Sequence, residues 1–416
     1  MKKIITFLGI QAKKTTYCFQ GQNYDGEVFA EALHKFCNYD SMLVCVTSEA
    51  KEKTFPILEK LEEKRIQAVE IPTGQSTEEM WETFKLINQK VNENDSVIFD
   101  ITHGLRSLPF LVFLFAAYLK AAKNVTIEAI YYGAWELGFS NNGIAPVIDL
   151  SEFIGMLDWL TATERFVEIG DGQPLADLLK KGMPSKIELR DSISARELKR
   201  DLEAASKAIE SISLALRLTR PIETMEEATK LEQALKKAEP SIAKQAQPFR
   251  ILGEQVVKEY GQFALENPRE NSQLANNLWL QLKMIQWYRE RQQIVQAVTL
   301  TREWIVSVLA LKFGEPMFSN KNGRSEVERA LNNGVRIQSK KTVDTISSCD
   351  EKLKNLANKD ELIDLWQQVT ELRNDIAHVG MNPDPKLAKT LKDRFEKIYP
   401  SLSELVASLL PPQENY

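Results

Sequence analysis

Arginine and histidine stand close together in one segment near the C-terminus. The segment reads Glu371-Leu-Arg-Asn-Asp-Ile-Ala-His378, so four residues separate Arg373 from His378, the one histidine in the C-terminal half. Histidine titrates near neutral pH and can transfer protons, and arginine makes bidentate contacts to phosphate. These groups suit metal-free RNA cleavage, in which the ribose 2'-hydroxyl loses a proton, the leaving 5'-oxygen gains one, and the charged phosphorane is stabilised.

The residues before His378 predict an amphipathic helix, and Arg373 falls within its apolar stripe. That stripe consists of Leu362, Leu365, Trp366, Val369, Leu372 and Ile376. A charged residue on a buried stripe needs a reason. Two explanations stay open: an internal ion pair with an acidic residue such as Glu303 on the predicted helix 295–311, or a role in catalysis.

The spacing of Arg373 and His378 also bears on assembly. Residues five apart on an α-helix differ by about 140° in direction, so one helix does not aim both side chains at one small target. Two copies facing each other across a two-fold axis could, which makes a homodimer part of the expected mechanism. Asn374 and Asp375 could orient the pair, although a solvated helix face explains Asp375 equally well. His378 precedes Gly380 at the helix C-terminus, where the macrodipole favours a cation.

A second candidate for chemistry is the polar segment Asp100-Ile-Thr-His-Gly-Leu-Arg-Ser-Leu-Pro109, which follows a predicted strand. The start of the next helix favours an anion there, so this loop is the best phosphate site in the chain. A helix cap with a surface arginine and a catalytic base at His103 are the alternatives. The candidate ligand residues in this loop are Thr102, His103, Gly104, Leu105 and Arg106.

Small polar residues also follow three other predicted strands. In an open α/β sheet, ligands bind beyond the carboxyl ends of the strands. The residues concerned are Gly9, Gln11, Thr15, Thr16 and Tyr17 after the first strand, Thr47 and Ser48 after the second, and the segment 73–77 with Gly74 and Gln75 after the third.

The elements that position these loops alternate between strand and helix patterns, which predicts a Rossmann-like domain with a mostly parallel sheet. The predicted strands are 3–10, 42–47, 66–71, 96–101, 126–132 and 144–148, and the predicted helices are 26–36, 54–64, 77–91 and 105–122. After about Leu150 the strand signal ends and the pattern becomes helical, with long helices expected over 194–218 and 222–237. The fold class is therefore α/β followed by all-α.

Composition excludes several classes of protein. The 416 residues carry a net charge of -5, so the surface as a whole is not a basic surface for nucleic acid. Four cysteines without a CxxC pair indicate no structural zinc site and no disulfide framework, which fits a reducing cytoplasm. The longest apolar run, 108–119, is too short for a membrane span and is expected to be a helix buried against the sheet. No GxGxxG or GxxxxGK[ST] motif is present, which argues against dinucleotide binding and against an NTPase.

Taken together, the motifs are similar to those of a known family, the CARF-HEPN ancillary ribonucleases of type III CRISPR systems, which cyclic oligoadenylates activate. The matching segments are IITFLGI with TTYCF, VTSEA, PTGQSTEEMWETF, VIFDITHGLRSLP, TREWIVSVLALKFG and ELRNDIAH. The resemblance implies a CARF sensor domain at 1–150, a helical connector at 151–290 and a HEPN ribonuclease domain at 291–416.

The resemblance also implies roles for individual residues. Arg373 and His378 would be catalytic with Asn374 in support, and Thr102, His103, Gly104, Leu105 and Arg106 would bind the activator, with Gly9, Gln11, Thr47, Ser48, Gly74 and Gln75 around the same pocket.

The expected protein is a homodimer that could assemble further. It would need no cofactor or metal beyond its activator, most often cyclic tetra-adenylate, and would cut single-stranded RNA to 2',3'-cyclic phosphate and 5'-hydroxyl ends. No membrane association is expected.

Two alternatives come from other classes: a ligand-sensing regulator that cleaves nothing, and a sensor that also degrades its own activator through Thr102 or His103. A metal-dependent DNA nuclease ranks lowest, because the helical half shows no compact Asp and Glu-x-Lys arrangement.

Overall fold

The computed structural model describes residues 1–104, 107–245, 247–319, 323–381 and 383–412. It divides into two compact units, Met1–Asp158 and Trp159–Tyr416. The boundary between these units, after Asp158, lies close to the predicted end of the sheet domain at residue 150. The second unit is one body in this division, so the predicted border between a connector and an effector domain near residue 290 stays a prediction.

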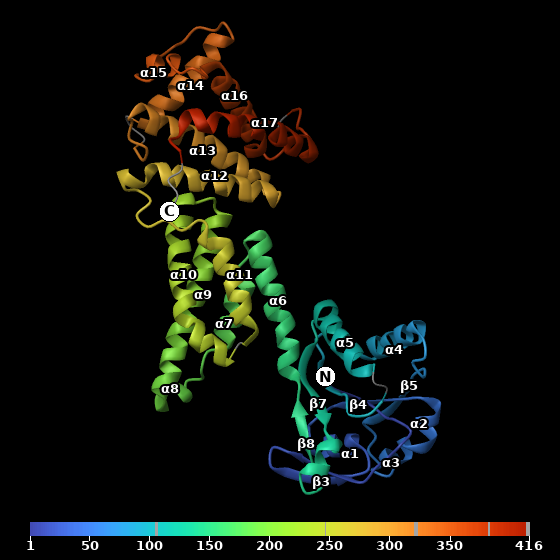
Figure 1. Cartoon of the computed structure of the whole chain (residues 1–416). Helices are drawn as coiled ribbons and strands as arrows, with labels where there is room; N and C mark the ends of the chain where they lie inside the picture. Colours follow the sequence, from blue (N-terminus) through green and yellow to red (C-terminus); the bar gives the residue numbers. More distant parts are fainter. Residues whose placement is uncertain (105–106, 246, 320–322, 382, 413–416) are drawn as a thin grey trace. The chain divides into compact units, whose positions relative to one another are not determined.

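The first unit is built on one sheet with the strand order β3-β2-β8-β7-β6-β1-β4-β5 (Figure 1). Its strands are β1 (Lys2–Phe7), β2 (Thr15–Phe19), β3 (Gln22–Gly26), β4 (Ser41–Val46), β5 (Ile66–Glu70), β6 (Ser96–Asp100), β7 (Thr126–Gly133) and β8 (Ile144–Asp149). The five strands β7-β6-β1-β4-β5 run parallel, while β8 is antiparallel to β7. The prediction of a mostly parallel, Rossmann-like sheet is confirmed.

The β2–β3 hairpin was not predicted. Residues 15–17, expected in a ligand loop after the first strand, instead form part of β2, which pairs antiparallel with β3 and parallel with β8. Gln20 and Gly21 adopt positive φ angles of 50° and 80° in the two-residue turn between them. Such turns match the twist of the strands that they join, so the segment QGQ after a β-rich run carried a hairpin signal.

Helices cover both faces of the sheet (Figure 1). Neighbouring residues of β1 show the alternation: Ile4 packs in one core with α1, and Ile5 packs in the opposite core with α5. Both isoleucines are fully buried, as expected for a central parallel strand. The helices of this unit are α1 (Phe29–Phe36), α2 (Ser48–Lys53), α3 (Phe55–Glu59), α4 (Thr77–Lys90), α5 (Leu108–Lys123) and the 3-10 helix η1 (Trp135–Ser140).

Helix α5 is only half covered, contrary to the expectation of a buried helix. One face, with Val112, Ala116 and Leu119, packs in the core. The other leaves Phe110 70% and Leu114 52% exposed, because the sheet can cover only one side of a helix that is apolar all round.

The second unit is helical throughout its described residues, as predicted. Its elements are the end of α6 (Ser151–Ile169), then α7 (Gln173–Lys181), α8 (Glu188–Asp191), α9 (Ile193–Arg217), α10 (Pro221–Gln245), α11 (Gln247–Gly261), η2 (Asn271–Gln273), α12 (Leu274–Glu290), α13 (Ile294–Phe313), α14 (Ser325–Gln338), α15 (Asp350–Lys354), α16 (Lys359–Ala377) and α17 (Ala388–Leu409). One hydrophobic core extends from Ala162 to Leu410.

Within the described chain, α13 is the one helix long and apolar enough to cross a membrane. Most of that stretch is buried against other helices, and Trp304, Ile305 and Leu309 are fully buried. The central helix of a helical core has the same length and composition, so α13 is weak evidence for a membrane span.

Candidate functional site

A pocket of about 610 Å³ opens at the carboxyl ends of the central strands of the first unit. It brings together five of the predicted ligand residues, Gly9, Gln11, Thr102, His103 and Gly104. Its remaining lining residues are Ile10, Ile101, Pro109, Tyr132, Trp135, Glu136 and Leu150. The loops after β1 and β6 therefore meet at one site, as the strand order of a parallel sheet predicts.

A buried carboxylate holds the loop after β6 in place. Asp100, fully buried at the end of β6, accepts hydrogen bonds from the Thr6 hydroxyl at 2.6 Å and from the Thr102 backbone N–H at 2.7 Å. The Thr102 hydroxyl oxygen in turn accepts from the backbone N–H of Gly133 at 2.7 Å. Burial raises the pKa of Asp100 above its ordinary value. This chain of bonds ties three strands to the floor of the pocket.

Replacing Asp100 with alanine is expected to lower the free energy of unfolding by about 2 to 4 kcal/mol, because the Thr6 hydroxyl and the Thr102 N–H would both be left without an acceptor. Chemical denaturation of the full chain measures this loss. Asp25→Ala is the matched control, since Asp25 accepts its bond from Thr16 at the surface and should cost under about 1 kcal/mol. Equal losses in the two variants would contradict the structural role of Asp100.

His103 is a neutral, partly buried group in the structure. Its Nε2 accepts a hydrogen bond from the backbone N–H of Phe29 at 3.3 Å, which a protonated nitrogen cannot do. Burial lowers the pKa of His103 below its ordinary value of 6.5, and the nearby Asp100 opposes this effect. The imidazole therefore joins the β6 loop to the start of α1.

The lowered pKa of His103 predicts a loss of stability in mild acid. A neutral histidine stabilises the fold above pH 6.5, and this contribution is lost as the pH falls through the lower pKa of the folded state. The unfolding midpoint of the wild type should therefore drop further between pH 7.5 and 5.5 than that of His103→Gln, whose amide oxygen can still accept from Phe29. Thermal unfolding followed by circular dichroism tests this. Asp100, whose raised pKa acts in the opposite sense, is present in both proteins; parallel pH profiles would refute the assignment.

Four other predicted ligand residues do not line the pocket. Thr47 caps α2 by accepting from the Ala50 N–H, and the Ser48 hydroxyl bonds to Glu70. The backbone N–H groups of Gly74 and Gln75 donate to the Glu79 carboxylate at 2.7 and 3.0 Å, so the loop after β5 already carries an anion of its own. Two more predicted residues, Leu105 and Arg106, lie outside the described residues.

Among the pocket residues that were not predicted, three are aromatic or acidic: Tyr132, Trp135 and Glu136. They stand at the end of β7 and at the start of η1, in the segment YYGAWELG. This strand was predicted, and the rule that ligands bind beyond the carboxyl ends of strands applied to it as well. Two aromatic residues and a carboxylate at and just after the end of a predicted strand were the signal that could have identified this part of the pocket.

The second predicted site lies at the end of α16, in the helical unit. Arg373, Asn374 and His378 are all exposed there, and the Arg373 Nη1 donates to the Asn374 Oδ1 at 3.2 Å. His378 caps the helix, with its backbone N–H bonded to the carbonyl oxygen of Asn374. The helix ends because Val379 and Gly380 adopt positive φ angles.

The expectation that Arg373 lies on a buried stripe is wrong. The stripe is buried from Leu362 to Leu372 and Ile376 still packs against the core, but the side chain of Arg373 is exposed to solvent. The suggested partner, Glu303, instead pairs with Arg302 at 3.4 Å and with Arg324 at 2.6 Å.

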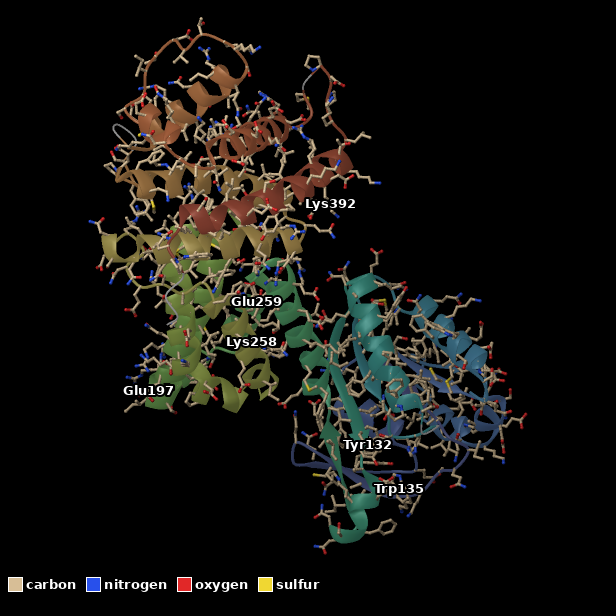
Figure 2. All side chains as sticks on the ribbon, turned by 45° about the horizontal axis from the view of Figure 1, so that its top comes forward. Tyr132, Trp135, Glu197, Lys258, Glu259 and Lys392 are labelled. Atoms are coloured by element: carbon tan, nitrogen blue, oxygen red, sulfur yellow. The ribbon has the colours of Figure 1, made fainter. Side chains whose placement is uncertain are left out.

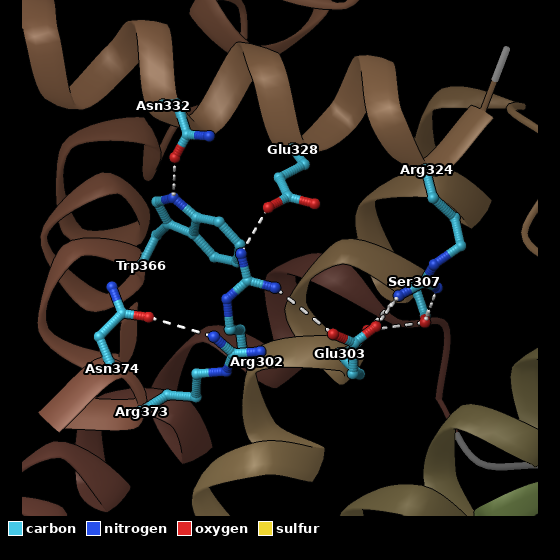
Figure 3. Close-up of polar contacts among 9 residues, drawn as sticks. All are labelled: Arg302, Glu303, Ser307, Arg324, Glu328, Asn332, Trp366, Arg373 and Asn374. Atoms are coloured by element: carbon cyan, nitrogen blue, oxygen red, sulfur yellow. Dashed lines mark hydrogen bonds and ion pairs between the residues drawn. The ribbon is translucent and has the colours of Figure 1, made fainter. Parts of the chain in front are cut away.

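A polar network stabilises α16 two turns before Arg373 (Figure 3). The guanidinium of Arg302, on α13, lies 4.7 Å from the centre of the Trp366 ring and also pairs with Glu328 of α14. The Trp366 indole N–H donates to the Asn332 Oδ1 at 3.0 Å. Two helices, α13 and α14, are thus fixed against the one that carries Arg373 and His378.

Metal ligands do not gather in either region: among the residues that the structure describes, no group of three His, Cys, Asp or Glu side chains could hold an ion.

Two family models match this chain over separate ranges. Residues 3–136 match the CARF domain of the CRISPR system endoribonuclease Csx1. Together with the sheet and its pocket, this match identifies the first unit as a Rossmann-like CARF domain. A helical region follows this domain in the chain. Residues 155–276, for which the sequence offered no motif, match the second domain of the CRISPR-associated protein MJ1674.

A curated relative points the same way. The chain is 33% identical over 114 residues to CRISPR-associated protein MJ1674 of Methanocaldococcus jannaschii. The match covers 26% of this chain and 18% of the relative. Neither matched range of the family models reaches α16, so the HEPN assignment of residues 291–416 stays a prediction.

Proposed function

We propose that this protein is a metal-independent endoribonuclease of type III CRISPR defence whose activity is switched on by a cyclic oligoadenylate. One observation carries the proposal: a single chain joins a CARF domain, whose pocket includes Thr102, His103 and Gly104, to a helix whose exposed end presents Arg373 and His378. The arginine would bind the scissile phosphate, and the histidine would move protons between the 2'-oxygen and the 5'-oxygen.

The proposed assembly is a homodimer, and an exposed apolar face on the first unit supports it. Helices α4 and α5 border a groove of about 390 Å³ whose lining includes Trp81, Leu114 and Tyr118. Trp81 is 66% exposed, and Phe110 extends the same side of α5. A monomeric protein rarely leaves so many large apolar side chains together in solvent. A second copy packed on this face would bury them.

The dimer matters for both proposed sites. A cyclic tetranucleotide has two-fold symmetry that a pair of pockets can match, and two copies of α16 could supply Arg373 from one helix and His378 from the other. Activation then requires that the ring binds the cleaving arrangement more tightly than the idle one. A cytoplasmic location agrees with four free cysteines and belongs to the same proposal.

The test is cleavage of a labelled single-stranded RNA by the full chain in EDTA, with and without cyclic tetra- or hexa-adenylate. We expect ring-dependent cutting that leaves 2',3'-cyclic phosphate and 5'-hydroxyl ends, and no cutting of the all-deoxy oligonucleotide of the same sequence, which lacks the nucleophile. Equal cutting of the deoxy strand would refute the mechanism. Tight binding of a ring without any cutting would instead support a regulator that acts through a partner of the helical unit.

A further inference from the structure

One wall of the CARF pocket has a composition that phosphate binding does not explain. Tyr132, Trp135 and Glu136 line it together, from the end of β7 and the start of η1. Figure 2 shows Tyr132 and Trp135 near each other at this end of the sheet. A carboxylate repels phosphodiesters, so Glu136 needs a different part of the ligand to face.

The carboxylate of Glu136 is held in position. The Tyr132 hydroxyl donates to the Glu136 Oε2 at 2.7 Å. Burial, followed by this hydrogen bond, raises the pKa of Tyr132 to about 12, so the phenol keeps its proton and remains a donor at neutral pH. The other carboxylate oxygen can accept a hydrogen bond from a ligand.

Trp135 offers an aromatic surface beside that carboxylate. Its ring is half-buried at the pocket and packs edge-on against Phe139, with 5.9 Å between the ring centres. The Lys13 ammonium lies over both rings, 4.7 Å from the centre of Trp135 and 4.4 Å from that of Phe139. The wall therefore has an indole ring with an ammonium over it and a hydrogen-bond acceptor beside it. A base that stacks on the ring face under Lys13 would displace this ammonium, which a phosphodiester could then attract.

We propose that this wall is the base-recognition subsite of the pocket, where Trp135 stacks on an adenine and Glu136 accepts a hydrogen bond from its 6-amino group. The inference rests on the proposed activator and adds which residues read its bases. Stacking alone tolerates every base, whereas an anchored acceptor favours a base with an amino group at that position. Glu136 is thus the specificity residue, and Trp135 supplies affinity.

The experiment measures the affinity of the full chain for two rings by isothermal titration calorimetry: cyclic tetra-adenylate, and the same ring with purine in place of adenine, which lacks the 6-amino group. We expect the wild type to prefer the adenine ring by about tenfold or more, since each lost hydrogen bond to an anchored charged group weakens binding by roughly that factor. Glu136→Ala should bind both rings equally, and Glu136→Gln, which keeps an amide oxygen, should retain part of the preference.

Trp135 is tested with the same two rings. Trp135→Ala should weaken both by roughly tenfold or more while keeping the preference for adenine, and Trp135→Phe should restore most of the affinity. Leu137→Ala, in the same short helix but outside the pocket lining, and Glu52→Gln, on α2, are the matched controls and should bind as the wild type does. Circular dichroism and the unfolding midpoint confirm that each variant is folded.

The outcomes separate this inference from the proposed function. Failure of the wild type to bind either ring refutes cyclic tetra-adenylate as the activator, and the subsite with it. Binding by the wild type with an unchanged adenine preference in Glu136→Ala overturns the role of Glu136 alone. Tighter binding of both rings by Glu136→Ala would show that the carboxylate only repels phosphate, which also overturns it. If Trp135→Ala binds both rings as tightly as the wild type does, Trp135 does not stack on a base.

Discussion

Replacing His378 with alanine is expected to lower the ring-activated rate of RNA cleavage by about a hundredfold to ten-thousandfold, the range that loss of a general acid or base produces. Arg373→Ala should cause a loss of similar size, because the phosphorane would no longer meet a guanidinium. Initial rates on a labelled RNA in EDTA, at saturating cyclic tetra-adenylate, measure both effects.

The controls for this experiment come from the same chain. His34 lies in the first unit, where its Nδ1 is hydrogen-bonded to the Tyr39 hydroxyl, and Arg394 lies on α17, where it pairs with Glu371 at 3.4 Å. His34→Ala and Arg394→Ala should cleave RNA within a few-fold of the wild type. Because Arg373 and His378 are both exposed, their variants should unfold at the wild-type temperature. Full activity in His378→Ala would exclude the proposed mechanism.

The second large effect is expected at Gly104, where alanine should abolish the response to the activator. Allosteric coupling of the usual strength corresponds to about a 5-fold to 150-fold stimulation, and Gly104→Ala should reduce this ratio to nearly one. Gly104 lines the pocket with a φ of 117°, and a Cβ there would lie 2.5 Å from the Leu108 Cδ1. The loop would have to leave its conformation, together with the donors that it presents.

Gly143 provides the comparison for that variant. It also has a positive φ, 82°, but a Cβ added there meets nothing within 4 Å, and the residue does not line the ligand pocket. Gly143→Ala should keep the ratio of cleavage with and without cyclic tetra-adenylate. The same loss of response in both variants would mean that backbone strain, rather than the pocket, causes it.

The periodicity of apolar residues and the local composition were sufficient to predict most strands and helices of the first unit. The alternation that places Ile4 and Ile5 in opposite cores follows from strand geometry alone, and the predicted strand over 96–101 matches β6 to within a residue. The β2–β3 hairpin escaped because its polar outer strand has the composition of a loop. Its strand β2 also pairs with β8, more than 100 residues further along the chain, and no local pattern reveals that contact.

The candidate sites show a different limit of sequence reasoning. The residues that converge on the pocket from the loops after β1 and β6 could be predicted, because strand order decides which loops meet. Trp135 and Glu136 were not predicted, because an indole and a carboxylate are not typical of a phosphate-binding loop. Arg373 was assigned to the core because helical periodicity gives a direction around the axis but not the width of the face that neighbouring helices cover.

The edges of the sheet determine how copies of this chain can associate. An exposed edge strand recruits further strands and leads to open-ended polymers. Here one edge is β3, whose Gln22, Asn23 and Asp25 are exposed, and the other is β5, which ends at Glu70 in a pair with Lys51. Polar and charged edges of this kind disfavour growth by strand addition. The proposed dimer would therefore form through a helix face such as that of α5, where a two-fold contact closes on itself instead of extending into a fibre.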